Sequence, residues 1–218
     1  MQTIKKLAPN AAGPQSMAKR RITHSAWGGI MSHHLDYEIN KELGECYLFM
    51  GDMDKAEDYY RKAVDANTGQ ASPYLGLAAI AIQRGNLEGA LTLYTKAASI
   101  EPNDKSLTGV GLVKMELGAH EEAFTCFSQA LAHNPENAVA LNCIVREGYN
   151  LSRLEEVVPH LQTCLEGSPD KEAVRVTLAG CLMSLGRNEE ARHHLETVLG
   201  NNPANAGAQE LFDNIAAA

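Results

Sequence analysis

The chain has 218 residues, enough for one or two ordinary domains, and 44% of them are hydrophobic while only 6% are aromatic. This mixture is typical of a helical protein built from small and aliphatic side chains. It argues against a β-sandwich, which needs more β-branched and aromatic runs. The formal net charge of −8 argues against nucleic-acid binding. No stretch approaches the run of about 18 apolar residues that crosses a membrane, so membrane insertion is not expected.

The cysteines predict a reducing compartment. They are odd in number, form no Cys-x-x-Cys pair and fall inside expected helices: Cys46, Cys126, Cys143, Cys164 and Cys181. Free thiols in such positions act as small buried hydrophobes. The N-terminus has no signal-peptide core, because Pro9, Asn10 and Pro14 interrupt its apolar residues. A cytoplasmic location is therefore expected.

Residues 1–31 are predicted to form a flexible basic leader. The first 35 residues contain five basic side chains and no acidic one: Lys5, Lys6, Lys19, Arg20 and Arg21. Residues 1–16 are rich in Pro, Ala, Gly and Gln, as flexible segments are. Trp27, the only tryptophan, either docks on the exposed first helix of the solenoid as a cap or stays unpacked, and docking is favoured because burial of an indole is stabilising. Whether the leader binds an acidic surface or only aids solubility stays open.

One sequence unit recurs about every 34 residues, the spacing of helix–turn–helix solenoids. It is clearest between Gly51 and Pro102, where each copy carries a turn glycine followed by an Ala–Tyr–Ala stripe. The stripes are Ala56, Tyr60 and Ala63, then Ala90, Tyr94 and Ala97. Residues spaced three and four apart share one helical face, so each stripe predicts a helix with one buried side.

Five such units are expected, in residues 37–70, 71–103, 104–137, 138–171 and 172–205, after a helix start near Ser32. A short helix from Gln209 to about Ile215 is expected to cap the last unit within residues 206–218. Glycines should end the first helices at positive φ, and prolines should stop the second helices of the later units. These are Gly51, Gly85, Gly118 and Gly186, then Pro102, Pro135, Pro169 and Pro203. The fourth unit departs, with Ser152 in place of the glycine and Pro159 inside the second helix, which predicts a local bend.

The repeated pattern resembles the tetratricopeptide repeat family over residues 37–205. The resemblance implies an all-α, right-handed superhelical solenoid, in which the first helix of each pair lines a concave face that binds peptides. Projected onto that geometry, the candidate binding residues are Leu48, Phe49, Leu75, Ile82, Leu112, Met115, Asn142, Arg146, Tyr149, Asn150 and Met183. The polar ones lie together on the fourth unit. Their amides suit a peptide backbone and Arg146 suits a carboxylate. An ordinary solvated patch is the alternative.

No set of residues predicts an enzyme, a metal site or a cofactor. Paired glutamates such as Glu121 and Glu122 recur at the starts of second helices, where acidic side chains interact favourably with the helix dipole. We therefore expect a non-enzymatic scaffold that binds a peptide or helix of a partner protein in its concave groove. Two alternatives stay open. One is self-assembly, with the leader of one molecule in the groove of another. The other is a chaperone for secreted or pilus-type subunits.

Overall fold

The computed structural model describes residues 24–217, with side chains from His34 onward. That part of the chain contains eleven α-helices and no β-strand. The helices are α1 (His24–Phe49), α2 (Met53–Ala66), α3 (Ser72–Gln83), α4 (Leu87–Ile100), α5 (Asp104–Glu116), α6 (His120–His133), α7 (Ala138–Asn150), α8 (Leu154–Gly167), α9 (Glu172–Ser184), α10 (Asn188–Asn201) and α11 (Ala206–Ala216).

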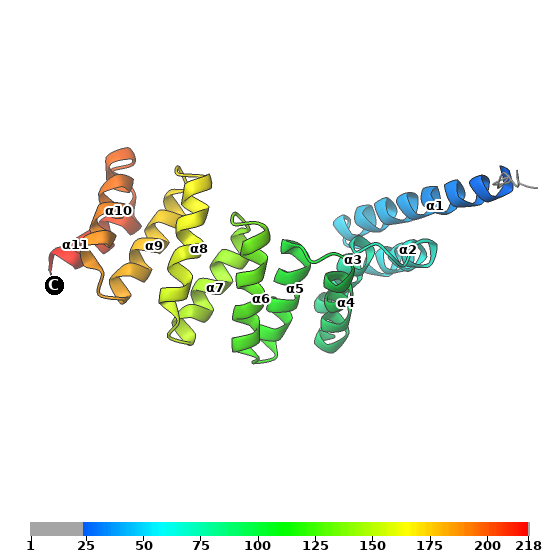
Figure 1. The fold of residues 1–218 in the computed structure, drawn as a ribbon, viewed down its shortest axis with the longest axis horizontal. Coiled ribbons are helices and arrows are strands. Elements are labelled where there is room, and N and C mark those ends of the chain that lie inside the picture. Colours follow the sequence, from blue (N-terminus) through cyan, green and yellow to red (C-terminus); the bar gives the residue numbers. More distant parts are fainter. Residues whose placement is uncertain (1–23, 218) are drawn as a thin grey trace, which may run out of the picture.

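The helices pack in consecutive pairs, and the pairs stack along one axis (Figure 1). Helix α1 pairs with α2, and the series ends with α9 and α10; α11 packs against both of these at the C-terminal end. Each pair contacts its neighbours along the stack, which is the arrangement of a solenoid. The expected all-α solenoid of paired helices is confirmed.

Helix α1 is 26 residues long and begins at His24, so the expected helix start at Ser32 is wrong. No proline lies between His24 and Ser32, and nothing in the backbone there stops a helix from extending upstream. Residues 24–31 of the predicted leader belong to this helix. Residues 1–23 lie outside the described part of the chain, and the docking predicted for Trp27 concerns a side chain outside it.

The turns between paired helices follow the prediction. Gly51, Gly85, Gly118 and Gly186 have φ of +79°, +76°, +78° and +74°, which glycine adopts without a Cβ clash. Ser152 takes the same conformation at φ +57°. A residue with a Cβ pays about 1 kcal/mol there. The fourth pair thus keeps the common turn although it lacks the glycine.

Prolines mark the ends of the later second helices, as predicted. Pro102, Pro135, Pro169 and Pro203 each lie just beyond the last residue of α4, α6, α8 or α10. Pro159 instead lies within α8, which continues from Leu154 to Gly167 without interruption. Its ring removes one backbone donor from the second turn of that helix. The bend expected at Pro159 stays a prediction.

Close packing between helices depends on small residues facing aromatic ones. A Cβ added at Gly44 of α1 would lie 2.7 Å from the Tyr60 ring, and one added at Gly76 of α3 would lie 2.3 Å from it. Tyr60 of α2 is therefore held between two first helices. Phe127 fills the same place against Gly111, where an added Cβ would lie 2.6 Å away. The small residues allow the approach, and the aromatic rings fill the space between helices.

The buried apolar residues form a small and a large cluster. The small one comprises Ala56, Tyr60 and Ile80 of the first two pairs. The large one extends from Met115 to Ile215 and joins α5 to α11. The continuous core thus lies in the C-terminal part of the solenoid.

Candidate peptide-binding groove

The first helices of the pairs line one side of the stack. Helix α3 contacts both α1 and α5, α5 also contacts α7, and α9 contacts α11. No comparable contact joins successive second helices in the described part of the chain. The first helices therefore lie on one side of the stack, here called the inner side, although α7 and α9 are not joined by contacts of that extent. This is where the predicted binding residues lie.

The predicted apolar residues differ widely in exposure. Leu48, Leu75, Ile82, Leu112 and Met183 are half-buried, while Phe49 is 95% exposed at the end of α1. Met115 was expected in the groove, but it is only 8% exposed and belongs to the large core cluster. The Arg146 guanidinium donates to its sulfur and covers it. Met115 thus lies in the core, because it packs within the large apolar cluster.

The predicted polar residues are all exposed, but most of them already have partners. Tyr149 shares a hydrogen bond of 3.2 Å with the Ser184 hydroxyl of α9. Arg146 Nε lies 3.6 Å from Glu147 Oε1, and Asn150 Nδ2 donates to Glu147 at 3.5 Å. Burial raises the pKa of the Tyr149 phenol, which the bond to Ser184 only partly offsets, so this group stays neutral near physiological pH. These side chains join α5, α7 and α9.

Asn142 is different. Among the described residues its side chain makes no hydrogen bond and is exposed. It lies at a cavity of about 190 Å³ between α7 and α9. The floor and walls are mainly apolar, formed by Leu141, Val145, Leu161, Ala173 and Val174, with Thr177 beside them. The volume is below the range of about 300–1,000 Å³ that small-molecule sites occupy, and it suits a single side chain.

An ion pair closes one end of this cavity. Lys171 Nζ lies 3.3 Å from Glu136 Oε2, and the Ser168 hydroxyl donates to the same carboxylate. These bonds lower the pKa of Glu136, with Ser168 the larger cause and Lys171 the second. The charges at this end are therefore satisfied within the protein. The apolar part between the helices remains open to a ligand.

A larger cavity of about 460 Å³ lies between α2, α3 and α4. Its charged side chains also pair with one another. Glu57 accepts hydrogen bonds from Arg61 and Arg84, which lower the pKa of the Glu57 carboxyl in that order. Arg84 further donates to Asp54 at 2.6 Å. The guanidinium groups there are occupied, so this cavity offers no free charge to an anionic ligand.

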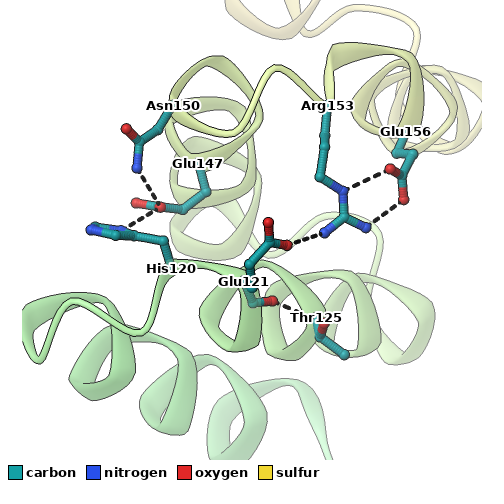
Figure 2. Close-up of polar contacts among 7 residues, drawn as sticks. All are labelled: His120, Glu121, Thr125, Glu147, Asn150, Arg153 and Glu156. Atoms are coloured by element: carbon teal, nitrogen blue, oxygen red, sulfur yellow. Dashed lines mark hydrogen bonds and ion pairs between the residues drawn. The ribbon is translucent and has the colours of Figure 1, made fainter.

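The structure also reveals a buried carboxylate that the sequence analysis did not single out. Glu147 is only 2% exposed, and His120 Nδ1 lies 2.8 Å from Glu147 Oε2. Figure 2 shows His120 and Asn150 converging on this carboxylate, while Arg153 lies between Glu121 and Glu156 nearby. Alignment of the repeats would have found Glu147, because the same position holds Ile80, Val113 and Cys181 in other pairs. A charged residue among apolar equivalents indicates a specific partner.

Three of the thiols are protected from nucleophilic chemistry by burial. Burial raises the pKa of Cys126, Cys143 and Cys181, so these groups remain protonated near neutral pH. No group of three or more potential metal ligands gathers within the described residues. None of the described helices is long and apolar enough to cross a membrane.

Comparison with curated proteins finds relatives that are much longer than this chain. BBSome complex member BBS4 of Bos taurus is 34% identical over 107 residues, which are 49% of this chain and 20% of BBS4. DnaJ homolog subfamily C member 7 of Homo sapiens is 27% identical over 186 residues, which are 78% of this chain and 37% of that protein. The chain therefore spans about a fifth of the first relative and well under half of the second.

Solved structures share the fold. PilF of Pseudomonas aeruginosa has a TM-score of 0.65 at 19% identity over 85% of each chain. YrrB, described as a TPR protein with an unusual peptide-binding site, has a TM-score of 0.59 at 25% identity, covering 72% of this chain and 82% of YrrB. Residues 50–108 and 151–215, more than half of the chain, match the family model described as tetratricopeptide repeat. The expected right-handed superhelical solenoid is thus confirmed, and the chain belongs to the tetratricopeptide repeat family.

Proposed function

We propose that this chain is a protein-interaction scaffold that binds an extended peptide of a partner protein on its inner face. The tetratricopeptide repeat fold supports a scaffold for protein partners in general. The finer proposal is that one apolar side chain of the peptide enters the cavity between α7 and α9. Asn142 would then bind the peptide backbone beside it.

The cavity is the observation that carries this proposal. It combines an apolar interior with polar groups at its edge, which is how extended peptides are commonly recognised. Leu141 and Val145 supply apolar surface from α7, and Val174 supplies it from α9. The Asn142 amide offers a donor and an acceptor, as a peptide backbone requires. Thr177 lies across from it on α9 and adds a hydroxyl.

The other predicted polar residues have a different role in this proposal. Arg146, Tyr149 and Asn150 hold neighbouring helices together through Met115, Ser184 and Glu147. We infer that they fix the spacing of α5, α7 and α9 and so shape the groove. A peptide carboxylate would have to compete with Glu147 for Arg146. The relative YrrB supports peptide binding by such a fold, since its structure is described as having a peptide-binding site.

Selection of peptides from a random display library on the full chain tests the proposal. Peptides that bind the wild-type chain are then measured against Ala173→Phe, which fills the cavity from an exposed position on α9. Loss of one buried apolar side chain from the complex is expected to weaken binding about tenfold or more. Ala132→Phe makes the same change at an exposed position on α6, outside the cavity, and is the matched control.

The two variants separate the outcomes. Weaker binding to Ala173→Phe with unchanged binding to Ala132→Phe supports the site. Equal binding of the selected peptides to both variants would show that the cavity is not where they bind. Failure to select any peptide from a library rich in apolar residues would contradict the proposed function itself.

A further inference from the structure

The outer side of α1 carries a face whose counterparts in the later first helices are largely buried. Ile39, Glu42 and Cys46 are exposed and lie on one side of α1, at spacings of three and four. By the repeat spacing, Cys46 corresponds to Ile80, Val113, Glu147 and Cys181. These four residues are at most 2% exposed. The position is therefore an internal one everywhere except in the first pair.

The preceding second helix is what buries this face. Glu42 corresponds to Gly76 and Gly109, and a Cβ added at either glycine would lie 2.3 Å from Tyr60 of α2 or Tyr94 of α4. Ile39 corresponds to the buried residues Pro73, Ser106 and Ala140, and to Val174 of α9, which is half-buried. Within the described residues, no helix precedes α1 to cover it. The outer face of α1 is thus an unoccupied inter-repeat packing site.

The chemistry of this face specifies its occupant. Leu35 and Ile39 are 59% and 46% exposed and offer apolar surface. Glu42 lies on this face, and Glu45 lies at its border with the inner side, where the repeat spacing places Leu112 and Arg146 in later helices. Neither glutamate takes part in an ion pair among the described side chains. An occupant with apolar residues flanked by basic ones would satisfy both features. The same solenoid offers a precedent, because Glu147 on the equivalent face is bound by His120 from the preceding helix.

A second copy of the chain is a poor occupant. Glu42 lies midway between Leu35 and Phe49, so antiparallel pairing of two α1 helices would place Glu42 against Glu42. The C-terminal helix α11 exposes Glu210 and Asp213, which would add acidic residues to an acidic face. Like charges placed together oppose association. The position of Glu42 is a glycine in α3 and α5, where the missing side chain leaves room for the tyrosine of the preceding second helix. Glu42 fills that room in α1.

We propose that residues 1–8 of the same chain cover this face. This segment contains Met1, Ile4 and Leu7 at spacings of three, with Lys5 and Lys6 beside them and no acidic residue. It has the apolar and basic groups that the face requires, and it is attached to α1 itself. Such tethering gives an effective concentration in the millimolar range, which favours this segment over a separate partner.

The chain is long enough for this contact. Residues 9–23 join the segment to α1 and include Pro9, Gly13 and Pro14, which suit a change of direction. Fully extended, this connection reaches about 50 Å. The distance along α1 from His24 to Cys46 is about 33 Å at the rise of an α-helix. Residues 1–8 can therefore reach both Glu42 and Glu45.

Alkylation of Cys46 in the full chain tests the proposal. Cys46 lies at the C-terminal end of the face, and its labelling by a maleimide is followed separately from the other thiols by peptide mass. Docked residues 1–8 should protect it. The variant Lys5→Glu/Lys6→Glu should label about tenfold faster, because two favourable charge contacts become repulsive.

A charge exchange sharpens the test. Adding Glu42→Lys/Glu45→Lys to Lys5→Glu/Lys6→Glu should restore protection, since the opposite charges face each other again. Lys19→Glu/Arg20→Glu makes the same change in net charge outside the proposed segment and should label like the wild type. These three variants separate a specific contact from a general electrostatic effect.

Several results would overturn the proposal. One is equal labelling of the wild type and Lys5→Glu/Lys6→Glu, which would show an open face. Another is a failure of the exchanged charges to restore protection, or faster labelling of Lys19→Glu/Arg20→Glu. Protection that grows with protein concentration would show that the occupant comes from a second copy.

Discussion

Glu147 brings a carboxylate into a position that is apolar in the neighbouring repeats. It is 2% exposed, and its closest partner is His120 Nδ1 at 2.8 Å. His120 belongs to the third pair and Glu147 to the fourth, so this contact spans an inter-repeat interface (Figure 2). A buried charge is tolerated only when its hydrogen-bonding capacity is met. The stability of this interface should therefore depend on His120.

The first prediction concerns His120→Ala. The His120 side chain is 41% exposed, so its truncation removes little buried surface. Its removal nevertheless leaves the buried Glu147 carboxylate without its closest partner. The free energy of unfolding is expected to fall by about 1–3 kcal/mol. Urea denaturation followed by circular dichroism measures it, with His193→Ala, at an exposed position on α10, as the control that should change little.

A second substitution distinguishes the cause. Glu147→Ile introduces the residue found at the equivalent position of α3, where Ile80 is 2% exposed. Because His120→Ala/Glu147→Ile contains no unpaired carboxylate, it should regain much of the lost stability. A double variant that is less stable than His120→Ala alone would contradict the explanation.

At the scale of helices and loops, carboxylates at the starts of first helices accept hydrogen bonds from the loop that precedes the next first helix. Asp104 of α5 accepts hydrogen bonds of 2.9 Å from both Asn134 and Asn137. Glu172 of α9 accepts equivalent bonds from Asn202 and Asn205 at 2.9 and 3.1 Å. Asn137 and Asn205 are also the N-caps of α7 and α11. Each carboxylate thus positions the start of the following first helix.

The second prediction is a pH dependence of this contact. Burial opposes ionisation of Asp104, but the bonds from Asn134 and Asn137 outweigh it, and the pKa of Asp104 lies below its ordinary value. Its ionised form therefore stabilises the fold above the unfolded-state pKa of about 3.9. That contribution is lost as the pH falls through the lower folded-state pKa.

The measurement is the urea midpoint from pH 7 down through the acidic range, below the ordinary carboxyl pKa of about 3.9. Asp104→Asn should lower the midpoint at neutral pH and reduce its fall on acidification. Asp65→Asn, at an exposed position near the end of α2, should keep the wild-type dependence. Identical acid profiles for the wild type and Asp104→Asn would exclude this role of Asp104.

The elements most predictable from the sequence were those fixed by local backbone chemistry. The glycine turns and the proline ends of helices followed directly, since φ and the missing N–H are properties of single residues. The start of α1 was not predictable, because a serine N-cap signal at Ser32 does not prevent helix upstream. The burial of Met115 depends on its packing against residues of other helices, and the cavity beside Asn142 depends on the spacing of α7 and α9. These features require tertiary packing.

At the scale of the whole molecule, the unequal cores predict an unequal resistance to opening. In solenoids, local stability follows the contacts between neighbouring repeats. The small cluster around Tyr60 should protect α2 and α3 less from amide hydrogen exchange than the large cluster protects α7 and α8. Leu161→Ala, at a position 1% exposed in α8, should lower the protection of α7 to α9 by about 2–4 kcal/mol while leaving α2 and α3 unchanged. Uniform exchange along the chain, or an equal loss of protection in α2, would instead show that all repeats unfold as one cooperative unit.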